Sequence, residues 1–313
     1  MSGAIHNHAY PAAPAHQTSE GSPRRGAEGH SNSESHRVYE PGECLRKPRA
    51  QRRAEVDVER TLNLFGFRVF DATLGETARL LVVSALCGHR QRVSFVNAHC
   101  INVSYRDETY RHAVATSDLV LADGSGLALA AKTFGFKLRD NVNGTDLFPI
   151  LCRQAAAEGV GLFLFGGQEG NAKKSAARMQ DKYPALRICG THHGFMKSAA
   201  DEARIIDAIN ASGAAILLVG MGVPLQDVWL ERNHQRLAPA IVVGVGGLFD
   251  YYSDRIPRAP KTLRAAGLEW CWRLAMEPRR LARRYLLGNV EFIARLARLR
   301  YGVEQPRIQP SPT

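Results

Sequence analysis

The stretch that decides the fold is residues 215–260, AILLVGMGVPLQDVWLERNHQRLAPAIVVGVGGLFDYYSDRIPRAP. Two short apolar runs, 215–219 and 241–245, each break into a glycine-rich turn. Buried parallel strands that open into glycine and acid at their carboxyl ends form the ligand crevices of open α/β sheets. The polar residues in or just after these turns are Gln226, Asp227 and Asp250. The stretch therefore predicts a ligand site and favours an enzyme.

The same alternation extends toward the N-terminus. Short apolar runs alternate with helical patterns of about 10–15 residues, which is typical of βαβ units and a parallel sheet. We expect an α/β fold, with a Rossmann-like, mostly parallel sheet flanked by helices, and Thr145 as one helix N-cap. The expected strands are 92–96, 119–122, 160–165, 186–190, 215–219 and 241–245, and the expected helices are 77–87, 106–117, 124–132, 145–157, 171–182, 199–211 and 224–237.

Composition divides the 313 residues into four expected parts. Residues 1–57 are rich in His, Ser, Pro and Arg without an apolar core, so we expect a disordered tail and no signal peptide. Residues 58–254 are expected to form the α/β domain, 255–301 a basic helical appendage and 302–313 a loose tail. No apolar run reaches the ~18 residues of a membrane span, so any membrane association is expected to be peripheral.

The net charge of +11 suggests an anionic partner: nucleic acid, an anionic membrane surface or a phosphorylated substrate. Most of this charge lies in residues 255–300, which carry twelve basic and three acidic residues. The basic residues are Arg255, Arg258, Lys261, Arg264, Arg273, Arg279, Arg280, Arg283, Arg284, Arg295, Arg298 and Arg300.

The cysteines and histidines do not predict a metal site. Six cysteines are scattered singly, without a Cys-x-x-Cys pair, and most read as small buried apolar residues. This usage fits a reducing compartment. The histidines of the N-terminal tail are irregularly spaced, and neither cysteine nor acid supports them as ligands. We therefore expect neither a metal nor a cofactor.

Asp123 is the candidate catalytic residue. It lies where a strand gives way to Gly124-Ser125-Gly126, so its carboxylate is placed to act as a general base in a crevice. The alternative is a helix N-cap, a common role for Asp. Asn97, at the end of the preceding strand, either orients a substrate or serves as a structural turn residue.

Two glycine turns are candidate substrate contacts. Gly166-Gly167 joins a strand to a helix, where backbone N–H groups can meet a phosphate, although a plain βα turn explains it equally well. Gln226 can hydrogen-bond a nucleobase or a sugar hydroxyl. Asp227 has the alternative role of complementing a helix dipole, and Asp250 is expected to support the site from behind.

The basic appendage has two functional interpretations. Its arginines can stabilise a departing diphosphate without a metal, or they can attract anionic lipid. A solvated helix face is the alternative. Arg258 follows the last glycine turn and Arg273 lies between Trp272 and Leu274. Both are therefore less typical of solvent-exposed surface residues than the later arginines are.

Several motifs in order resemble the WecG/TagA/CpsF family of bacterial glycosyltransferases, over about residues 60 to 290. They are Asp123-Gly124, Gly144-Thr145-Asp146-Leu147, the Phe-Gly-Gly turn, the 183–195 run YPALRICGTHHGF, Gly222 to Asp227, the IPRAP segment, and Leu268-Glu269-Trp270 through Arg280. The resemblance implies an inverting, metal-independent transfer of glucose, N-acetylmannosamine or a related hexose. The donor would be a UDP-sugar, and the acceptor a polyprenyl-diphosphate-linked saccharide used for cell-surface polysaccharides. It also implies that the enzyme acts as a peripheral protein at the cytoplasmic face of the membrane, and that the appendage completes the active site.

Carried over residue by residue, the resemblance makes Asp123 the base, Asn97 a substrate contact and Gln226 a residue near the nucleotide sugar. Departures from the family pattern include Ala122 before Asp123 and Asp227 in place of Glu. The full set of expected substrate-binding residues is Asn97, Gly124, Gly166, Gly167, Gly222, Gln226, Asp227, Gly247, Asp250, Arg258, Arg273 and Arg280.

Two other functions would fit parts of this sequence. A nucleic-acid-binding protein would use the same basic segment, but no RNA-binding aromatic signature or DNA-binding module is present, so no nucleic acid is expected. A nicotinamide-dependent oxidoreductase would need a glycine fingerprint, GxGxxG, that is missing. The sequence leaves homo-oligomer formation open.

Overall fold

The computed structural model describes residues 60–303. The expected tail over 1–57 and most of the expected tail over 302–313 lie outside the described residues.

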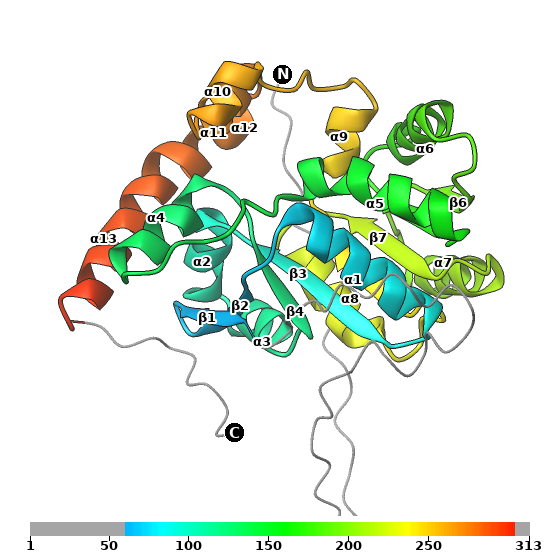
Figure 1. Ribbon diagram of the computed structural model, residues 1–313, viewed down its shortest axis with the longest axis horizontal. Coiled ribbons are helices and arrows are strands. Elements are labelled where there is room, and N and C mark those ends of the chain that lie inside the picture. Colours follow the sequence, from blue (N-terminus) through cyan, green and yellow to red (C-terminus); the bar gives the residue numbers. More distant parts are fainter. Residues whose placement is uncertain (1–59, 304–313) are drawn as a thin grey trace, which may run out of the picture. The chain divides into compact units, whose positions relative to one another are not determined.

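Eight strands form one sheet in the order β1-β2-β4-β3-β8-β7-β5-β6, drawn in Figure 1. The β1–β2 pair is antiparallel and the other neighbours are parallel, which confirms the expected mostly parallel α/β sheet. The strands are β1 Thr61–Leu64, β2 Phe67–Phe70, β3 Gln91–Val96, β4 Leu119–Ala122, β5 Leu162–Gly166, β6 Ile188–His192, β7 Ile216–Gly220 and β8 Ile241–Gly244.

Helices cover both faces of the sheet, which explains why β4, β5, β7 and β8 are apolar throughout rather than alternating. In β5, Leu162 and Leu164 pack on one face, whereas Phe163 and Phe165 pack on the other. One face is covered by α1 Leu74–Leu86, α5 Gly144–Glu158, α6 Asn171–Lys182 and α9 Leu248–Tyr252. The other is covered by α2 Ala98–Ser104, α3 Glu108–Ala115, α4 Ser125–Thr133, α7 Ala199–Ala211, α8 Leu225–Asn233 and α13 Gly288–Arg300.

The C-terminal segment is helical, as expected, and its last helix returns to the core. Short helices precede α13, which buries Phe292 and Leu296 in the same apolar cluster as Phe65. Figure 1 shows α13 beside α4 and α2, far from them in sequence. The short helices are α10 Lys261–Ala265, α11 Glu269–Met276, α12 Pro278–Ala282 and the π-helical turn η1 Arg283–Leu287.

One helix was not predicted and one predicted N-cap is wrong. The expected helix 106–117 is confirmed as α3, in which Asp107 accepts a hydrogen bond from the backbone of Tyr110 and caps the helix, whereas α2 was not predicted. Thr145 does not cap α5, because the side chain of Asn143 accepts from the Asp146 N–H at 2.8 Å and begins the helix earlier.

The first hairpin, β1–β2, was not predicted. Its two-residue turn is Phe65-Gly66, with φ values of 56° and 88°. Two left-handed residues match the twist of a tight hairpin, and Asn63 accepts from the Gly66 N–H. The strands are only four residues each, too short for a periodic signal.

Candidate active site

The parallel register of β3 and β4 brings two predicted residues together. Val96 pairs with Ala122, so the next residues, Asn97 and Asp123, leave the same edge of the sheet side by side. The Asn97 amide Nδ2 donates to Asp123 Oδ2 at 3.1 Å. Residues 26 positions apart in sequence therefore form one polar pair.

Both ends of the Asn97 amide are used. Its Oδ1 accepts from the backbone N–H groups of His99 and Cys100 at 3.1 Å, which caps α2. The amide therefore presents its N–H₂ group to Asp123. Asn97 is thus a structural turn residue and a hydrogen-bond partner of the candidate base, and its role as a substrate contact remains a prediction.

Asp123 does not cap a helix. Helix α4 begins after Gly124, which makes no side-chain cap, and the Gly124 N–H donates to Asn141 Oδ1 at 2.6 Å. Gly124 has φ +89°, a conformation that favours glycine. The carboxylate is thus left facing the pocket.

Burial raises the pKa of Asp123, while the Asn97 hydrogen bond and the positive charges of Arg284 and Arg273 lower it. With these effects combined, the pKa of Asp123 remains above its ordinary value. A carboxylate with a raised pKa is a stronger base than a solvated one, which suits proton abstraction.

Asp123 lines a pocket of about 590 Å³ whose opposite wall comes from the C-terminal segment. That wall contributes cations, a carboxylate and aromatic rings. The lining residues from it are Arg264, Gly267, Glu269, Trp270, Arg273, Arg284, Tyr285, Asn289, Phe292 and Ile293. From the sheet side come Asn97, Ala98, His99, Asp123, Gly124, Ser125, Gly126, Leu129, Asn141, Asn143, Thr145 and Tyr251.

Arg273 is the predicted arginine that reaches this pocket. Its guanidinium lies over the ring of Tyr251 at 4.9 Å and pairs with Glu277 at 3.8 Å. A Cβ on Gly247 would lie 2.7 Å from Arg273 Nη2. Gly247 thus leaves room for this guanidinium where it now lies, and its role as a substrate contact remains a prediction.

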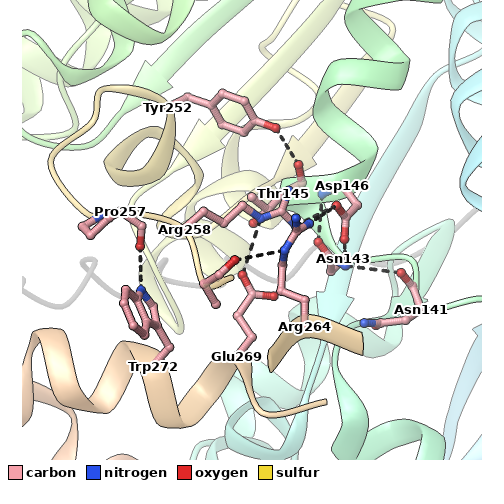
Figure 2. Close-up of polar contacts among 11 residues, drawn as sticks. Asn141, Asn143, Thr145, Asp146, Tyr252, Pro257, Arg258, Arg264, Glu269 and Trp272 are labelled. Carbon is pink, nitrogen blue, oxygen red and sulfur yellow. Dashed lines mark hydrogen bonds and ion pairs between the residues drawn. The ribbon is translucent and has the colours of Figure 1, made fainter. Parts of the chain in front are cut away.

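The other two predicted arginines have acidic partners and are absent from the pocket lining. Arg258 Nη2 donates to Asp146 Oδ1 at 2.6 Å, as Figure 2 shows. Arg280 pairs with Glu277 on its own helix turn. As substrate contacts both remain predictions.

Gln226 and Asp227 lie beneath the glycine turns rather than in the pocket. Gln226 Oε1 accepts from the Gly222 N–H at 3.1 Å and from the Gly246 N–H at 2.8 Å, so one buried amide ties the turns after β7 and β8. Asp227 Oδ1 accepts from Ser94 Oγ at 2.8 Å. Burial raises the pKa of Asp227 to about 6, against hydrogen bonds that lower it.

The remaining predicted residues lie at the carboxyl ends of β5 and β8. Gly166 packs on the backbone of Gly220, and the Gly167 N–H donates to the Gly220 carbonyl at 2.8 Å. Asp250 accepts from Asn171 at 2.9 Å and pairs with Arg255 at 3.1 Å. None of these predicted residues is part of the pocket lining described above.

Sequence reasoning missed several lining residues. Asn143 carries a readable signal, since Asn followed three residues later by Asp is an N-cap pattern. Arg284 carries none, because it looks like every other arginine of the basic run. His99 also carries none; its pKa is lowered to about 4 by burial and by Arg284 and Arg106, so it is neutral at pH 7.

Within residues 60–303, no group of three or more His, Cys, Asp or Glu side chains is arranged to hold a metal ion. No helix in this same range is long and apolar enough to cross a bilayer.

The model of the glycosyl transferase WecG/TagA/CpsF family matches residues 62–306. The chain belongs to this family. The resemblance seen in the sequence and the expected enzyme class, glycosyltransferase, are thereby confirmed.

Two curated relatives share the name N-acetylglucosaminyldiphosphoundecaprenol N-acetyl-beta-D-mannosaminyltransferase. The protein of Bacillus spizizenii strain W23 is 29% identical over 174 residues, which cover 56% of this chain and 66% of the relative. The protein of Bacillus subtilis strain 168 is 27% identical over 191 residues, covering 61% of this chain and 73% of the relative. This member of the WecG/TagA/CpsF family thus aligns with about two thirds of the first relative's length.

Proposed function

We propose that this glycosyltransferase moves a hexose from a UDP-sugar to a polyprenyl-diphosphate-linked saccharide, with inversion at the anomeric carbon, in cell-surface polysaccharide biosynthesis. The observation that carries the proposal is the pocket itself, in which the Asp123–Asn97 pair faces Arg264, Arg273 and Arg284. One wall offers a base, and the other offers cations for a diphosphate.

The chemical step places Asp123 as general base. Its carboxylate accepts the proton of an acceptor hydroxyl while that oxygen forms a bond to the anomeric carbon. The bond between the anomeric carbon and the UDP oxygen breaks, and its electron pair leaves with UDP. A single displacement of this kind inverts the anomeric centre.

The pocket cations stabilise the leaving group. Negative charge grows on the diphosphate oxygens as the bond breaks, and preorganised donors at such a position are worth roughly 3 kcal/mol each. Arg273 is held for this purpose by Tyr251 and Glu277, so little reorganisation is needed. The chain's own arginines therefore supply the charge stabilisation in this scheme.

The lipid-linked acceptor is supported by the surface next to the pocket. Arg279, Arg280 and Arg283 are exposed, and they are followed by exposed Leu286 and Leu287. Basic and apolar groups side by side favour the interface of an anionic bilayer. We place the enzyme peripherally on the inner face of the cell membrane, with 58–254 as catalytic domain and 255–301 as appendage.

The relatives' names support the substrate class. They specify an N-acetyl-β-D-mannosaminyl group and an N-acetylglucosaminyl-diphosphoundecaprenol. N-acetylmannosamine is therefore the first donor sugar to test, with glucose next.

The test is UDP release from a panel of UDP-sugars, with and without a lipid-diphosphate acceptor, by wild type and Asp123→Asn. We expect acceptor-dependent release with at least one donor, and turnover lowered about 10²–10⁴-fold in the variant because the base is lost. An unchanged thermal melt would show that the variant folds. Near-normal turnover of Asp123→Asn would remove Asp123 from this role.

Binding measurements on the same protein distinguish the transferase from the two alternative functions. Tryptophan quenching by UDP but not by NAD supports the transferase. Quenching by NAD alone, or a salt-sensitive gel shift on RNA without UDP-sugar turnover, would overturn the proposal.

A further inference from the structure

Asp146, in the first turn of α5, is the point where the C-terminal segment is fastened to the sheet. Arg258 Nη2 lies 2.6 Å from Asp146 Oδ1, and Arg264 Nη1 lies 3.6 Å from the same oxygen. Arg258 Nε also lies 3.6 Å from Glu269 Oε1. Figure 2 shows these four side chains converging from α5, α10, α11 and the segment before α10.

The acid is fixed before it meets its partners. Its second oxygen, Oδ2, accepts from Asn143 Nδ2 at 2.7 Å, and its backbone N–H donates to Asn143 Oδ1 at 2.8 Å. The side chains of Asp146, Arg258 and Arg264 are 33%, 25% and 28% exposed. A partly buried pair whose acid also lies at a helix N-terminus is stronger than a fully exposed ion pair.

Neighbouring contacts reinforce this junction. The Tyr252 hydroxyl donates to the Thr145 carbonyl at 2.7 Å, and Trp272 Nε1 donates to the Pro257 carbonyl at 3.0 Å. The segment that carries Arg258 is therefore held on both sides.

The network lies behind the pocket wall. Arg264 and Glu269 line the pocket, whereas Asp146 and Arg258 do not. From this position the network can affect the pocket indirectly, through the helices α10 and α11 that it holds.

We propose that Asp146 is a positioning residue whose ion pairs with Arg258 and Arg264 hold α10 and α11 in place, so that Arg273 and Arg284 face Asp123. The structural half of this proposal stands alone. Its kinetic half rests on the proposed function.

The structural test is hydrogen exchange of the intact chain, comparing wild type with Asp146→Asn and, from the opposite side of the pair, Arg258→Gln. We expect amides of 261–287 to exchange about tenfold faster in each variant, with β3 and β7 unchanged, because the partly buried pair is lost. Asp146→Glu keeps the charge and should restore most of the protection. The double variant should exceed neither single variant, because both remove one interaction.

A matched control is Arg204→Gln, which removes the Arg204–Asp201 pair at the surface of α7. We expect no change in exchange over 261–287, since exposed pairs contribute little. Unchanged exchange in both Asp146→Asn and Arg258→Gln would overturn the proposal, as would an equal effect of the control.

The kinetic test is steady-state transfer. When the closed arrangement is only partly populated, apparent affinity falls by that fraction, so the acceptor KM should rise about tenfold with kcat nearly unchanged. Faster exchange with an unchanged KM would contradict the kinetic half. If the variants exchange faster but the wild type itself turns over no UDP-sugar, the structural half of the proposal stands and the proposed function is overturned instead.

Discussion

At the residue scale, the Asn97–Asp123 hydrogen bond affects the pKa of the proposed base, Asp123. Because this bond lowers the pKa of Asp123 against the effect of burial, Asn97→Ala should raise that pKa further. In its proposed role Asp123 works deprotonated, so the acid limb of the pH profile of kcat/KM should move to higher pH. Rate measurements between pH 4 and 9 would show the shift.

Asp107→Ala is the matched control for that shift. It removes the N-cap of α3 as Asn97→Ala removes that of α2, with no hydrogen bond to Asp123. We expect a loss of about 1 kcal/mol in stability and an unmoved acid limb. Equal pH profiles for the two variants would contradict the role of Asn97.

Asp227 gives a second residue-scale prediction. Its pKa is raised from 3.8 to about 6 by burial, so the folded state binds the proton more tightly than the unfolded chain. The stability contributed by this group is present below pH 3.8 and is lost as pH rises through about 6. Asp227→Asn should therefore gain up to roughly 3 kcal/mol relative to wild type between pH 4 and 7. Urea unfolding at several pH values checks this, and a constant difference across that range would refute it.

At the element scale, the largest side chain that α13 buries is Phe292. Phe292 is 2% exposed and its ring centroid lies 5.3 Å from that of Phe65. Phe292→Ala should cost about 3–5 kcal/mol in urea unfolding. The adjacent Ile293 also lines the pocket but is 47% exposed, so Ile293→Ala should cost well under half as much. Equal costs would mean that α13 is not docked through Phe292.

Elements with a strong pattern were predictable and short ones were not. Helices 171–182 and 199–211 were expected at the observed bounds because each carries a clear amphipathic pattern and an end signal. Helix α2 was missed because its seven residues follow β3 directly, and its cap, Asn97, was read as a turn. Tertiary packing, rather than local pattern, defines such elements.

The site was partly predictable for the same reason. Asp123 and Asn97 follow apolar strands, and a parallel sheet brings such residues to one edge. The arginines that reach this pocket depend on how the short C-terminal helices fold back. Arg258 and Arg284 are alike in sequence, yet one is paired with Asp146 and the other lines the pocket.

At the scale of the whole molecule, the basic surface should govern membrane binding. Each basic residue near an anionic bilayer contributes about 1 kcal/mol, so replacing Arg279, Arg280 and Arg283 by Gln should weaken binding about a hundredfold. Co-sedimentation with anionic vesicles at two salt concentrations measures this. The control replaces Lys173, Lys174 and Lys182 of α6, which are exposed on another helix, and should have a smaller effect. Equal losses would indicate a response to net charge alone.

The carboxylate and the cations of the pocket come from distant parts of the chain: Asp123 is encoded in its first half, whereas Arg264, Arg273 and Arg284 are encoded near its end. A ribosome that stops before position 264 has therefore made the proton acceptor without any of these guanidinium groups. Under the proposed mechanism such a truncated product would be unable to cleave a nucleotide sugar wastefully, so interrupted translation should yield an inert fragment rather than a leaky hydrolase.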